Sequence, residues 1–397
     1  MDLFKKCETF DAVKKLKEAD IYPYFHRLET KQAPEVVMEG HDIIMIGSNN
    51  YLGLTSHPEV CEAAIKAVEK YGSGCSGSRF LNGTLDIHVE LEKELAEFLQ
   101  KEDVVTFSTG FQSNLGIISA IAGRTDYILC DKENHASIYD GCRLSYAKML
   151  RYNHSDMEDL ERQIKTVPDT AGILIVTDGV FSMGGDICKL PEIVRIAKKY
   201  GARIMVDDAH ALGVLGAHGR GTAEHFGLEN EVDIYMGTFS KSLASLGGYM
   251  AAKKEVCEYV RHNSRPFIFS ASITPASVAS ARAALNILKR EPERVARLRD
   301  ISSYMRNKLK SLGVDLIDSG EKTPIIPIYT YYNVRTFKAC KMLFERGVYV
   351  NSTVSPAVPV GSSLLRTSYM ATHTEEQMDK AAAAIKEVLT LVKDINE

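Results

Sequence analysis

The 397-residue sequence lacks several features that would set it apart from ordinary globular proteins. It has no apolar run of the roughly 18 residues that a membrane-spanning helix needs. Its charged, amphipathic first 20 residues contain no signal-peptide core. The formal net charge of −4 provides no basic field for a phosphate backbone. We therefore predict a cytoplasmic protein with no transmembrane segment and no nucleic-acid partner.

Metal-binding patterns are also missing. The eight cysteines are scattered, with no C-x-x-C pair and no cysteine–histidine cluster at the spacing of a zinc site. The sequence contains no H-E-x-x-H, no G-x-x-x-x-G-K-[ST] and no G-x-S-x-G. We expect reduced thiols that mostly fill the core, and no bound metal.

One motif that is present points to a function we discount. The letters GSGCSG, residues 72–77, match the G-x-G-x-x-G dinucleotide fingerprint. That fingerprint binds a pyrophosphate only where a strand precedes it and a helix follows. Here a helical segment precedes it and the loop SRFLNGT follows. We expect these glycines to mark a tight turn near a ligand or an interface.

The middle of the chain alternates short apolar strands with helices, and 45% of all residues are hydrophobic. Continuous apolar strands that alternate with helices predict a mostly parallel sheet covered on both faces. Predicted strands are 103–109, 127–131, 172–179, 203–210 and 233–239, and predicted helices include 57–72, 88–100 and 190–201.

After about residue 280 the pattern changes to a long helical stretch over 276–313. A strand over 323–332, a helix around 335–347, a loop over 351–363, a strand over 364–371 and a last helix follow. We expect a separate α+β module here. The predicted division is an N-terminal segment 1–45, a large α/β domain 46–280 and a C-terminal α+β domain 281–397.

Polar residues gather where the predicted strands end. In a parallel α/β sheet, ligands bind outside the carboxyl ends of the strands. Any one such residue could simply cap a turn, but five strand ends together favour a site. These residues are Ser108, Thr109 and Gly110; Asp131 with His135; Asp178 with Ser182; Asp207 with His210; and Thr238, Ser240 and Lys241.

Pyridoxal 5'-phosphate (PLP) is the cofactor whose chemistry needs this set. Its aldehyde forms a Schiff base with a lysine, which Lys241 supplies, and its ring nitrogen is kept protonated by a carboxylate, for which Asp207 is the best candidate. Its phosphate needs backbone donors. Residues 108–123 place a glycine turn at the start of a helix, where free N–H groups and the helix dipole favour an anion.

Several longer motifs resemble the α-oxoamine synthases, which are fold type I, aspartate aminotransferase-like PLP enzymes. The stretches are TFSKS, VDDAHALGVLGAHGRG, NHASIYDGCRLS, GVFSMGGD, SNNYLGL and LLRTSYMATHT. The resemblance runs from about residue 20 to residue 390. It implies a mostly parallel sheet in the large domain and a smaller α+β C-terminal domain.

The resemblance also implies roles for individual residues. Lys241, His135, Asp207 and His210 are expected to be catalytic; Lys241 would carry PLP and later remove the Cα proton. The other expected PLP contacts are Gly110, Phe111 and Gln112 by their backbone, Ser182 and Thr238 by their hydroxyls, and Ser270 and Ser272 from a second subunit. Asn49, Asn50 and Arg366 are expected to bind substrate, Arg366 through the amino-acid carboxylate.

Members of this family join an amino acid to an acyl thioester with loss of carbon dioxide. TFSKS and IYPYF are most similar to the bacterial serine palmitoyltransferases, whereas TDGVFSM and SRPFIFSAS are similar to the glycine C-acetyltransferases. The implied substrates are an amino acid, best L-serine, and an acyl thioester carried on coenzyme A or acyl carrier protein. The resemblance further implies a homodimer with shared sites.

Other readings stay open at this stage. Within the family these are glycine C-acetyltransferase, 8-amino-7-oxononanoate synthase and cysteate acyltransferase. An aminotransferase would use Lys241 and Asp207 but no acyl thioester. A catalytically silent subunit that binds a partner would have no reason to keep both residues together with His135.

Overall fold

The computed structural model describes residues 2–317 and 323–396. By its internal contacts the described chain divides into two units. The first contains residues 2–48, 301–317 and 325–396, and the second contains residues 49–300 with 323 and 324. The division into an N-terminal segment 1–45, a large domain 46–280 and a C-terminal domain 281–397 stays a prediction.

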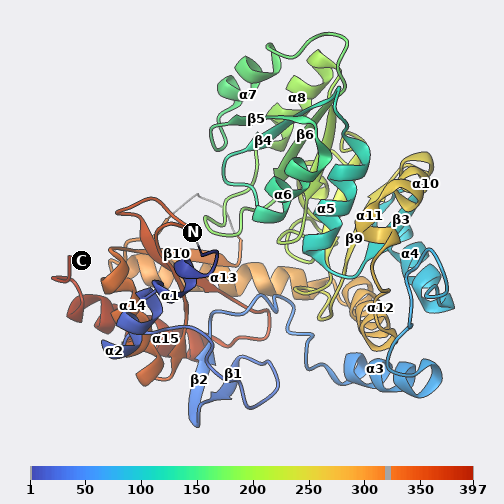
Figure 1. Ribbon diagram of the computed structural model, residues 1–397. Helices are drawn as coiled ribbons and strands as arrows, with labels where there is room; N and C mark the ends of the chain where they lie inside the picture. Colours follow the sequence, from blue (N-terminus) through green and yellow to red (C-terminus); the bar gives the residue numbers. More distant parts are fainter. Residues whose placement is uncertain (1, 318–322, 397) are drawn as a thin grey trace. The chain divides into compact units, whose positions relative to one another are not determined.

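The second unit is built on a seven-stranded sheet with the order β3-β9-β8-β7-β6-β4-β5 (Figure 1). Only β9 runs against its neighbours β3 and β8, so the predicted mostly parallel sheet is confirmed. The strands are β3 (Asp103–Phe107), β4 (Tyr127–Asp131), β5 (Lys148–Tyr152), β6 (Ile173–Asp178), β7 (Arg203–Asp207), β8 (Ile234–Thr238) and β9 (Gly248–Ala252).

Alternation along these strands sends side chains to two separate cores. Val104 and Leu129 belong to a core that includes side chains of α4, α7, α8 and α12, whereas Val105 and Ile128 belong to one that includes side chains of α5, α6, α10 and α11. Successive residues of a strand point to opposite faces, which explains why the strands are apolar throughout. Helices therefore cover both faces of the sheet.

The predicted helices 57–72, 88–100 and 190–201 are present in this unit as α3, α4 and α8. Its helices are α3 (Pro58–Tyr71), α4 (Asp86–Leu99), α5 (Gly110–Ile121), α6 (Ala136–Ser145), α7 (Met157–Ile164), α8 (Leu190–Tyr200), α9 (Thr222–Phe226), α10 (Lys254–Asn263), α11 (Arg265–Ile268) and α12 (Pro275–Arg290). Helix α13 (Glu293–Ser311) continues along the chain into the first unit.

The first unit holds two small sheets, with the orders β1-β2-β11 and β10-β13-β12. Its core contains Ile326 and Ile328 of β10, Leu365 of β13, and side chains of the helices α14 and α15. The elements are α1 (Lys5–Glu8), α2 (Ala12–Glu18), β1 (Glu35–Met38), β2 (His41–Met45), β10 (Ile325–Tyr331), α14 (Asn333–Glu345), β11 (Val348–Tyr349), β12 (Asn351–Thr353), β13 (Ser363–Ser368) and α15 (Glu375–Leu391).

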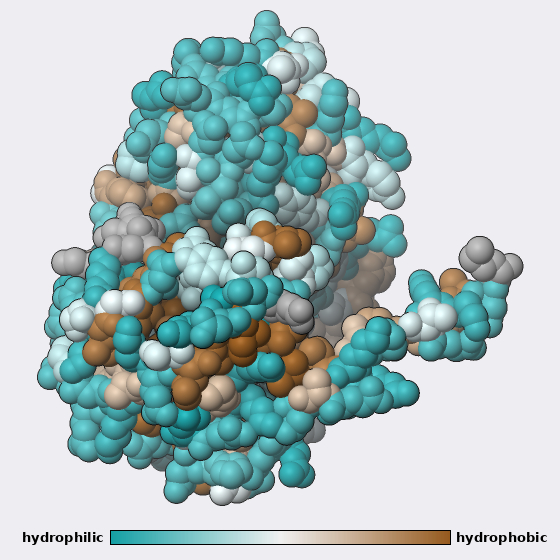
Figure 2. All heavy atoms as spheres, turned by 90° about the vertical axis from the view of Figure 1, so that its left-hand side faces the viewer, coloured by the Kyte–Doolittle hydropathy of each residue, from teal (hydrophilic) through white to brown (hydrophobic). Residues whose placement is uncertain are grey.

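The surface is mainly hydrophilic on the face drawn in Figure 2, with hydrophobic side chains in limited patches. Within residues 2–317 and 323–396, every helix is too short or too polar to cross a bilayer.

Candidate active site

A pocket of about 240 Å³ lies where the strands of the large sheet end. Its wall comes from the segments that follow β3, β4, β6, β7 and β8, which are the five strand ends singled out in the sequence. The lining residues are Thr109, Gly110, Phe111, Asn114, His135, Ser137, Asp178, Ser182, Asp207, Ala209, His210, Met236, Thr238, Ser240, Lys241 and Leu246.

The first unit contains a larger cavity, of about 870 Å³, which lacks the predicted lysine, aspartate and histidine residues. It is lined by parts of β1, β2 and β11 together with the charged side chains of Lys31, Arg346 and Lys380. None of the predicted site residues is among its described lining. We therefore place the candidate active site at the strand ends of the second unit.

Lys241 enters the pocket from a tight turn between β8 and β9. The backbone N–H of Phe239 donates to the carbonyl of Gly247, and that of Ser245 donates to the carbonyl of Phe239. The carbonyl of Lys241 itself accepts the N–H of Ala244. Because β8 is buried along its whole length, the lysine reaches the pocket only as the chain leaves the sheet.

Asp207 ends β7 and is 4% exposed. Its Oδ2 accepts a hydrogen bond from Asn114 Nδ2 at 2.7 Å, and its Oδ1 accepts the backbone N–H of Ala209 at 2.9 Å. These two donors fix the plane of the carboxylate. A buried carboxylate also favours a cation or a positively charged ligand group nearby.

Asn114 also connects Asp207 to His135. Its Nδ2 donates to Ser137 Oγ at 2.8 Å, and that hydroxyl lies 2.7 Å from His135 Nδ1. The backbone N–H of Ser137 donates to the same ring nitrogen at 3.3 Å, so Nδ1 is an acceptor. Burial lowers the pKa of His135. The ring is therefore neutral near pH 7, with its proton on Nε2.

Asp178 lies beside Asp207 because β6 and β7 pair these two residues directly. Its Oδ2 accepts the backbone N–H of His135 at 2.9 Å, which fixes the start of α6. Burial raises the pKa of Asp178 well above its ordinary value, and the charge of Asp207 adds to this effect. Burial therefore favours the protonated form of Asp178.

His210 is held by a residue that the sequence analysis did not include. The ring Nδ1 lies 2.7 Å from the Tyr51 hydroxyl, which also donates to Asn49 Oδ1 at 3.2 Å. Asn49 is therefore connected to the pocket indirectly, because it bonds Tyr51 and Tyr51 contacts the lining residue His210. Asn50 does not line the pocket; its Oδ1 accepts the N–H of Thr55 and closes a turn.

The first turn of α5 forms one side of the pocket. Thr109 caps this 12-residue helix by accepting the N–H of Gln112 on its hydroxyl. A Cβ at Gly110 would lie 2.8 Å from Thr238 Oγ1, so the close approach of α5 to β8 requires glycine. Phe111 lines the pocket, whereas the side chain of Gln112 donates to the carbonyl of Pro266.

The remaining predicted residues lie in three places. Ser182 lines the pocket. Ser270 and Ser272 do not; Ser272 donates through its N–H and hydroxyl to the carbonyl of Gly77, at 3.0 and 3.2 Å. Arg366 lies in β13 of the first unit, where its side chain is buried.

The structure adds pocket residues that the sequence analysis missed. Asn114, Ser137 and Leu246 line the pocket, and Tyr51 supports His210. Asn114 lies in the second turn of α5 and Ser137 in the first turn of α6, and both helices start soon after strand ends, which is the signal that could have found them. Tyr51 stands in the apolar stretch YLGL, and no local pattern there points to His210.

The comparisons with known proteins agree with this geometry. Residues 41–385 match the family model Aminotransferase class I and II. The chain is 53% identical to the serine palmitoyltransferase of Sphingobacterium spiritivorum, over 96% of this chain and 94% of that protein. It is 46% identical to the 8-amino-7-oxononanoate synthase of Thermoanaerobacter pseudethanolicus, over 95% of both chains.

The similarity extends to solved structures. A serine palmitoyltransferase from S. paucimobilis, solved with a PLP–myriocin aldimine, superposes with a TM-score of 0.96 at 37% identity, covering all of both chains. The fold is therefore that of the fold type I PLP transferases. With a matching family model over most of its length and relatives at about 50% identity, the chain belongs to the aminotransferase class I and II family, among the PLP-dependent α-oxoamine synthases.

Proposed function

We propose that the protein is a serine palmitoyltransferase, which joins L-serine to palmitoyl-CoA with loss of carbon dioxide and yields 3-ketosphinganine for sphingolipid synthesis. The observation that carries the proposal is the meeting of Lys241, Asp207 and His135 in one pocket of a chain 53% identical to a serine palmitoyltransferase. We further propose that it acts in the cytoplasm.

The residues of the pocket fit PLP. Lys241 supplies an amine, Asp207 a buried carboxylate, and the first turn of α5 with Thr238 supplies donors for a phosphate. Asn114 Oδ1 is a buried acceptor without a hydrogen-bond partner among the described residues, which suits a wall that meets a polar ligand. When bound, PLP supplies an electron sink that stabilises negative charge at the amino-acid Cα.

Each side chain of the pocket has a proposed role toward PLP. Lys241 would bind the cofactor aldehyde through its amine and would serve as the base that takes the proton from the amino-acid Cα. Asp207 would keep the ring nitrogen protonated. His135 would pack against the ring, and His210 with Ser182 would bind the phenolic oxygen. Gly110, Phe111 and Gln112 would offer backbone contacts to the phosphate.

Substrate binding is assigned to a second group of residues. Arg366 binds the amino-acid carboxylate, since a guanidinium offers a fixed charge and two parallel donors. Asn49 and Asn50 lie along the chain segment that leads to Tyr51 and thus to His210. The acyl donor is a thioester of coenzyme A or of acyl carrier protein.

We also propose a homodimer in which Ser270 and Ser272 of one subunit complete the phosphate site of the other. Phe269 beside them is 79% exposed and Leu81 is 76% exposed. The two stretches lie together in one subunit, since Ser78 forms a β-bridge with Ala271. Large exposed apolar side chains beside small hydroxyl residues are typical of a contact that a second copy would bury.

A second candidate is 8-amino-7-oxononanoate synthase, which is favoured by the 46% identity to such an enzyme. Glycine C-acetyltransferase and cysteate acyltransferase differ from both only in the two substrates. The test is to incubate the PLP-loaded enzyme with serine, glycine, alanine or cysteate and a series of acyl thioesters, and to identify products by mass.

We expect a long-chain 3-keto base from serine and palmitoyl-CoA, carbon dioxide release, and no product from the Lys241→Ala variant. A product from alanine and pimeloyl thioester alone would support the second candidate. A keto acid formed by amino-group transfer, without thiol release, would contradict both.

A further inference from the structure

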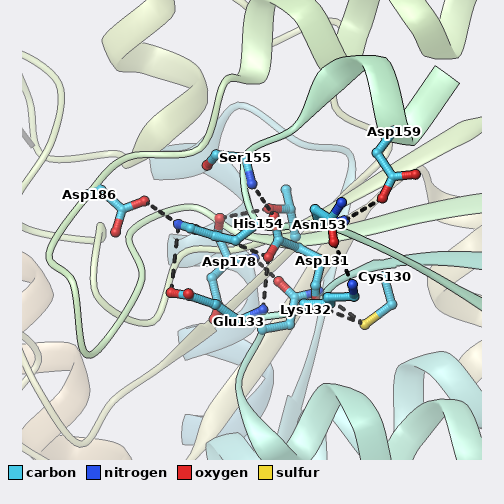
Figure 3. Close-up of polar contacts among 12 residues, drawn as sticks. Cys130, Asp131, Lys132, Glu133, Asn153, His154, Ser155, Asp159, Asp178 and Asp186 are labelled. Atoms are coloured by element: carbon cyan, nitrogen blue, oxygen red, sulfur yellow. Dashed lines mark hydrogen bonds and ion pairs between the residues drawn. The ribbon is translucent and has the colours of Figure 1, made fainter. Parts of the chain in front are cut away.

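A histidine outside the pocket connects the two loops that carry His135 and Ser182. Figure 3 shows His154 between Asp131, at the end of β4, and Asp186, in the loop after β6. His154 Nδ1 lies 3.0 Å from Asp131 Oδ1, and Nε2 lies 3.0 Å from Asp186 Oδ2. It is not among the residues that line the pocket.

The hydrogen-bond chemistry of this contact requires a charged ring. An ionised carboxylate only accepts hydrogen bonds, so each ring nitrogen must donate. A neutral imidazole has one N–H, which would leave a nitrogen lone pair facing a carboxylate oxygen. The imidazolium form has two, and it satisfies both contacts.

The surroundings of His154 favour the same form. Burial lowers its pKa, but hydrogen bonds and charge attraction from Asp131 and Asp186 outweigh this and raise the pKa to about 10. A third carboxylate lies near the ring, since Glu133 Oε2 is 3.7 Å from Nε2. The ring also meets Phe181 edge-on, at 4.4 Å between centroids.

Asp131 transmits the contact to the loop that carries His135. Its Oδ1 accepts the N–H of Glu133 at 2.8 Å and its Oδ2 accepts the N–H of Ser155 at 2.9 Å. The carboxylate is 2% exposed. It therefore orders the turn between β4 and α6, and His135 is the residue at the end of that turn.

Asp186 transmits the contact to the loop that carries Ser182. Its carbonyl accepts the N–H of Phe181 at 2.9 Å, and Val180 forms a β-bridge with Ile187. Ser182 and Met183 lie at the tip of the loop that these contacts close. The Phe181 ring against His154 adds an apolar contact to the ion pair.

We propose that protonated His154 is a positioning residue: it clamps the loop 131–135 to the loop 179–187 and so holds His135 and Ser182 in place for the PLP ring. The clamp itself depends only on the contacts described above. Its value for catalysis rests on the proposed function.

The test compares His154→Gln with His262→Gln in the protein without PLP and with it. Gln can bond one carboxylate but carries no charge. His262 is an exposed histidine of α10 with a carboxylate oxygen of Glu258 at 3.5 Å, so it is a matched control outside the clamp. Amide hydrogen exchange is measured in the protein without PLP, and PLP affinity is measured by absorbance titration.

In His154→Gln we expect exchange about tenfold faster or more in residues 131–137 and 179–187, and PLP affinity weakened by about tenfold, with no change in His262→Gln. Unchanged exchange in both loops would overturn the clamp, whatever the activity. The substrate panel on the unaltered enzyme tests the proposed function independently, because it does not depend on this variant.

A second variant covers the case in which His154→Gln does not fold. Asp186→Asn removes one of the two carboxylates, so a neutral ring becomes acceptable at Nε2. With isotope-labelled histidine, NMR should show His154 protonated up to at least pH 9 in the unaltered protein and deprotonating at lower pH in Asp186→Asn. A ring that titrates near pH 6.5 in the unaltered protein would contradict the proposal.

Discussion

At the scale of single residues, the chemistry of the pocket depends on how its charges are separated. Asp178 and Asp207 are paired across β6 and β7, and burial raises the pKa of Asp178. Asp207 instead receives two hydrogen bonds, from Asn114 Nδ2 and from the backbone N–H of Ala209. The two neighbouring carboxylates thus have different surroundings: burial favours the protonated form of Asp178, and two donors fix the plane of Asp207.

Asn114 should be the most sensitive of the residues that sequence analysis missed. We expect Asn114→Ala to lower the free energy of unfolding by about 1–3 kcal/mol, because Asp207 Oδ2 and Ser137 Oγ lose a buried donor. The turnover number should fall as well, since Asp207 and His135 lose their common support. Urea unfolding and steady-state kinetics check this against Asn286→Ala, an exposed site on α12. Equal effects of the two substitutions would contradict the assigned role.

Asp207→Asn should separate cofactor binding from turnover. We expect the variant to bind PLP and to lose activity by about 100-fold or more, since a neutral amide no longer holds the ring nitrogen protonated. Absorbance titration and product analysis measure the two effects. Asp140→Asn, at a partly exposed aspartate of α6, serves as the control. Turnover within a few-fold of the unaltered enzyme would show that Asp207 is not the ring-nitrogen partner.

At the scale of elements, the five predicted strands of the large sheet are all present, because each is a short apolar run that ends in polar residues. Strands β5 and β9 were not foreseen. The strand β5 carries Lys148 and Arg151 among its five residues, so its sequence lacks the continuous apolar run that predicts a buried strand. The strand β9 follows β8 after a short turn with no helix between them, which breaks the alternation that guided the prediction.

The polar residues at strand ends predict most of the pocket lining, but not the residues that hold those side chains in place. Strand ends can be found from composition, so Asp207, Thr238 and Lys241 were identified. Asn114 and Tyr51 contact partners 93 and 159 residues away, and no local pattern records such contacts. The predicted loop over 351–363 likewise contains β12, whose pairing with β13 is non-local.

Within the first unit, His373 links the turn before α15 to β2 and makes stability depend on pH. Its Nδ1 accepts the N–H of Met370, and Nε2 bonds the carbonyl of Met45 at 3.2 Å. Burial lowers its pKa from 6.5 to about 4. Because the folded-state pKa is depressed, this contribution to stability is present above pH 6.5 and is lost as the pH falls toward 4.

We expect His373→Gln to remove up to about 3 kcal/mol of that pH-dependent change in the free energy of unfolding between pH 6.5 and 4. Urea unfolding of the protein without PLP, at a series of pH values, measures it. His41→Gln, at an exposed histidine of β2, should keep the original slope. The same slope in all three proteins would mean that His373 does not carry the effect.

At the scale of the whole molecule, the proposed phosphate site would need residues from two subunits. In one subunit the segment with Ser270 and Ser272 contacts Gly77 and does not line the pocket. The proposed phosphate contact of this segment would therefore be made to a second copy, and a twofold dimer would use the same patch twice.

Mixing two inactive chains tests this sharing. Lys241→Ala and a chain with Ser270→Ala and Ser272→Ala are dissociated together and reassociated. If sites are shared, some mixed dimers contain one site with neither defect, and activity should return to a fraction of the original. The control mixes the Lys241→Ala chain with a triple variant that carries Lys241→Ala, Ser270→Ala and Ser272→Ala. This mixture should stay inactive, because neither chain supplies Lys241. No recovery, or a fully active monomer by sedimentation, would contradict shared sites.

The central claim is that the strand-end pocket holds PLP on Lys241, and borohydride reduction tests it most directly. Reduction converts a lysine–PLP Schiff base into a stable amine, so digestion and mass spectrometry identify the lysine. We predict one labelled peptide, containing Lys241, in the unaltered protein and in the exposed-site control Lys253→Ala, and no label in Lys241→Ala. Label on another lysine, or label that persists in Lys241→Ala, would contradict the account.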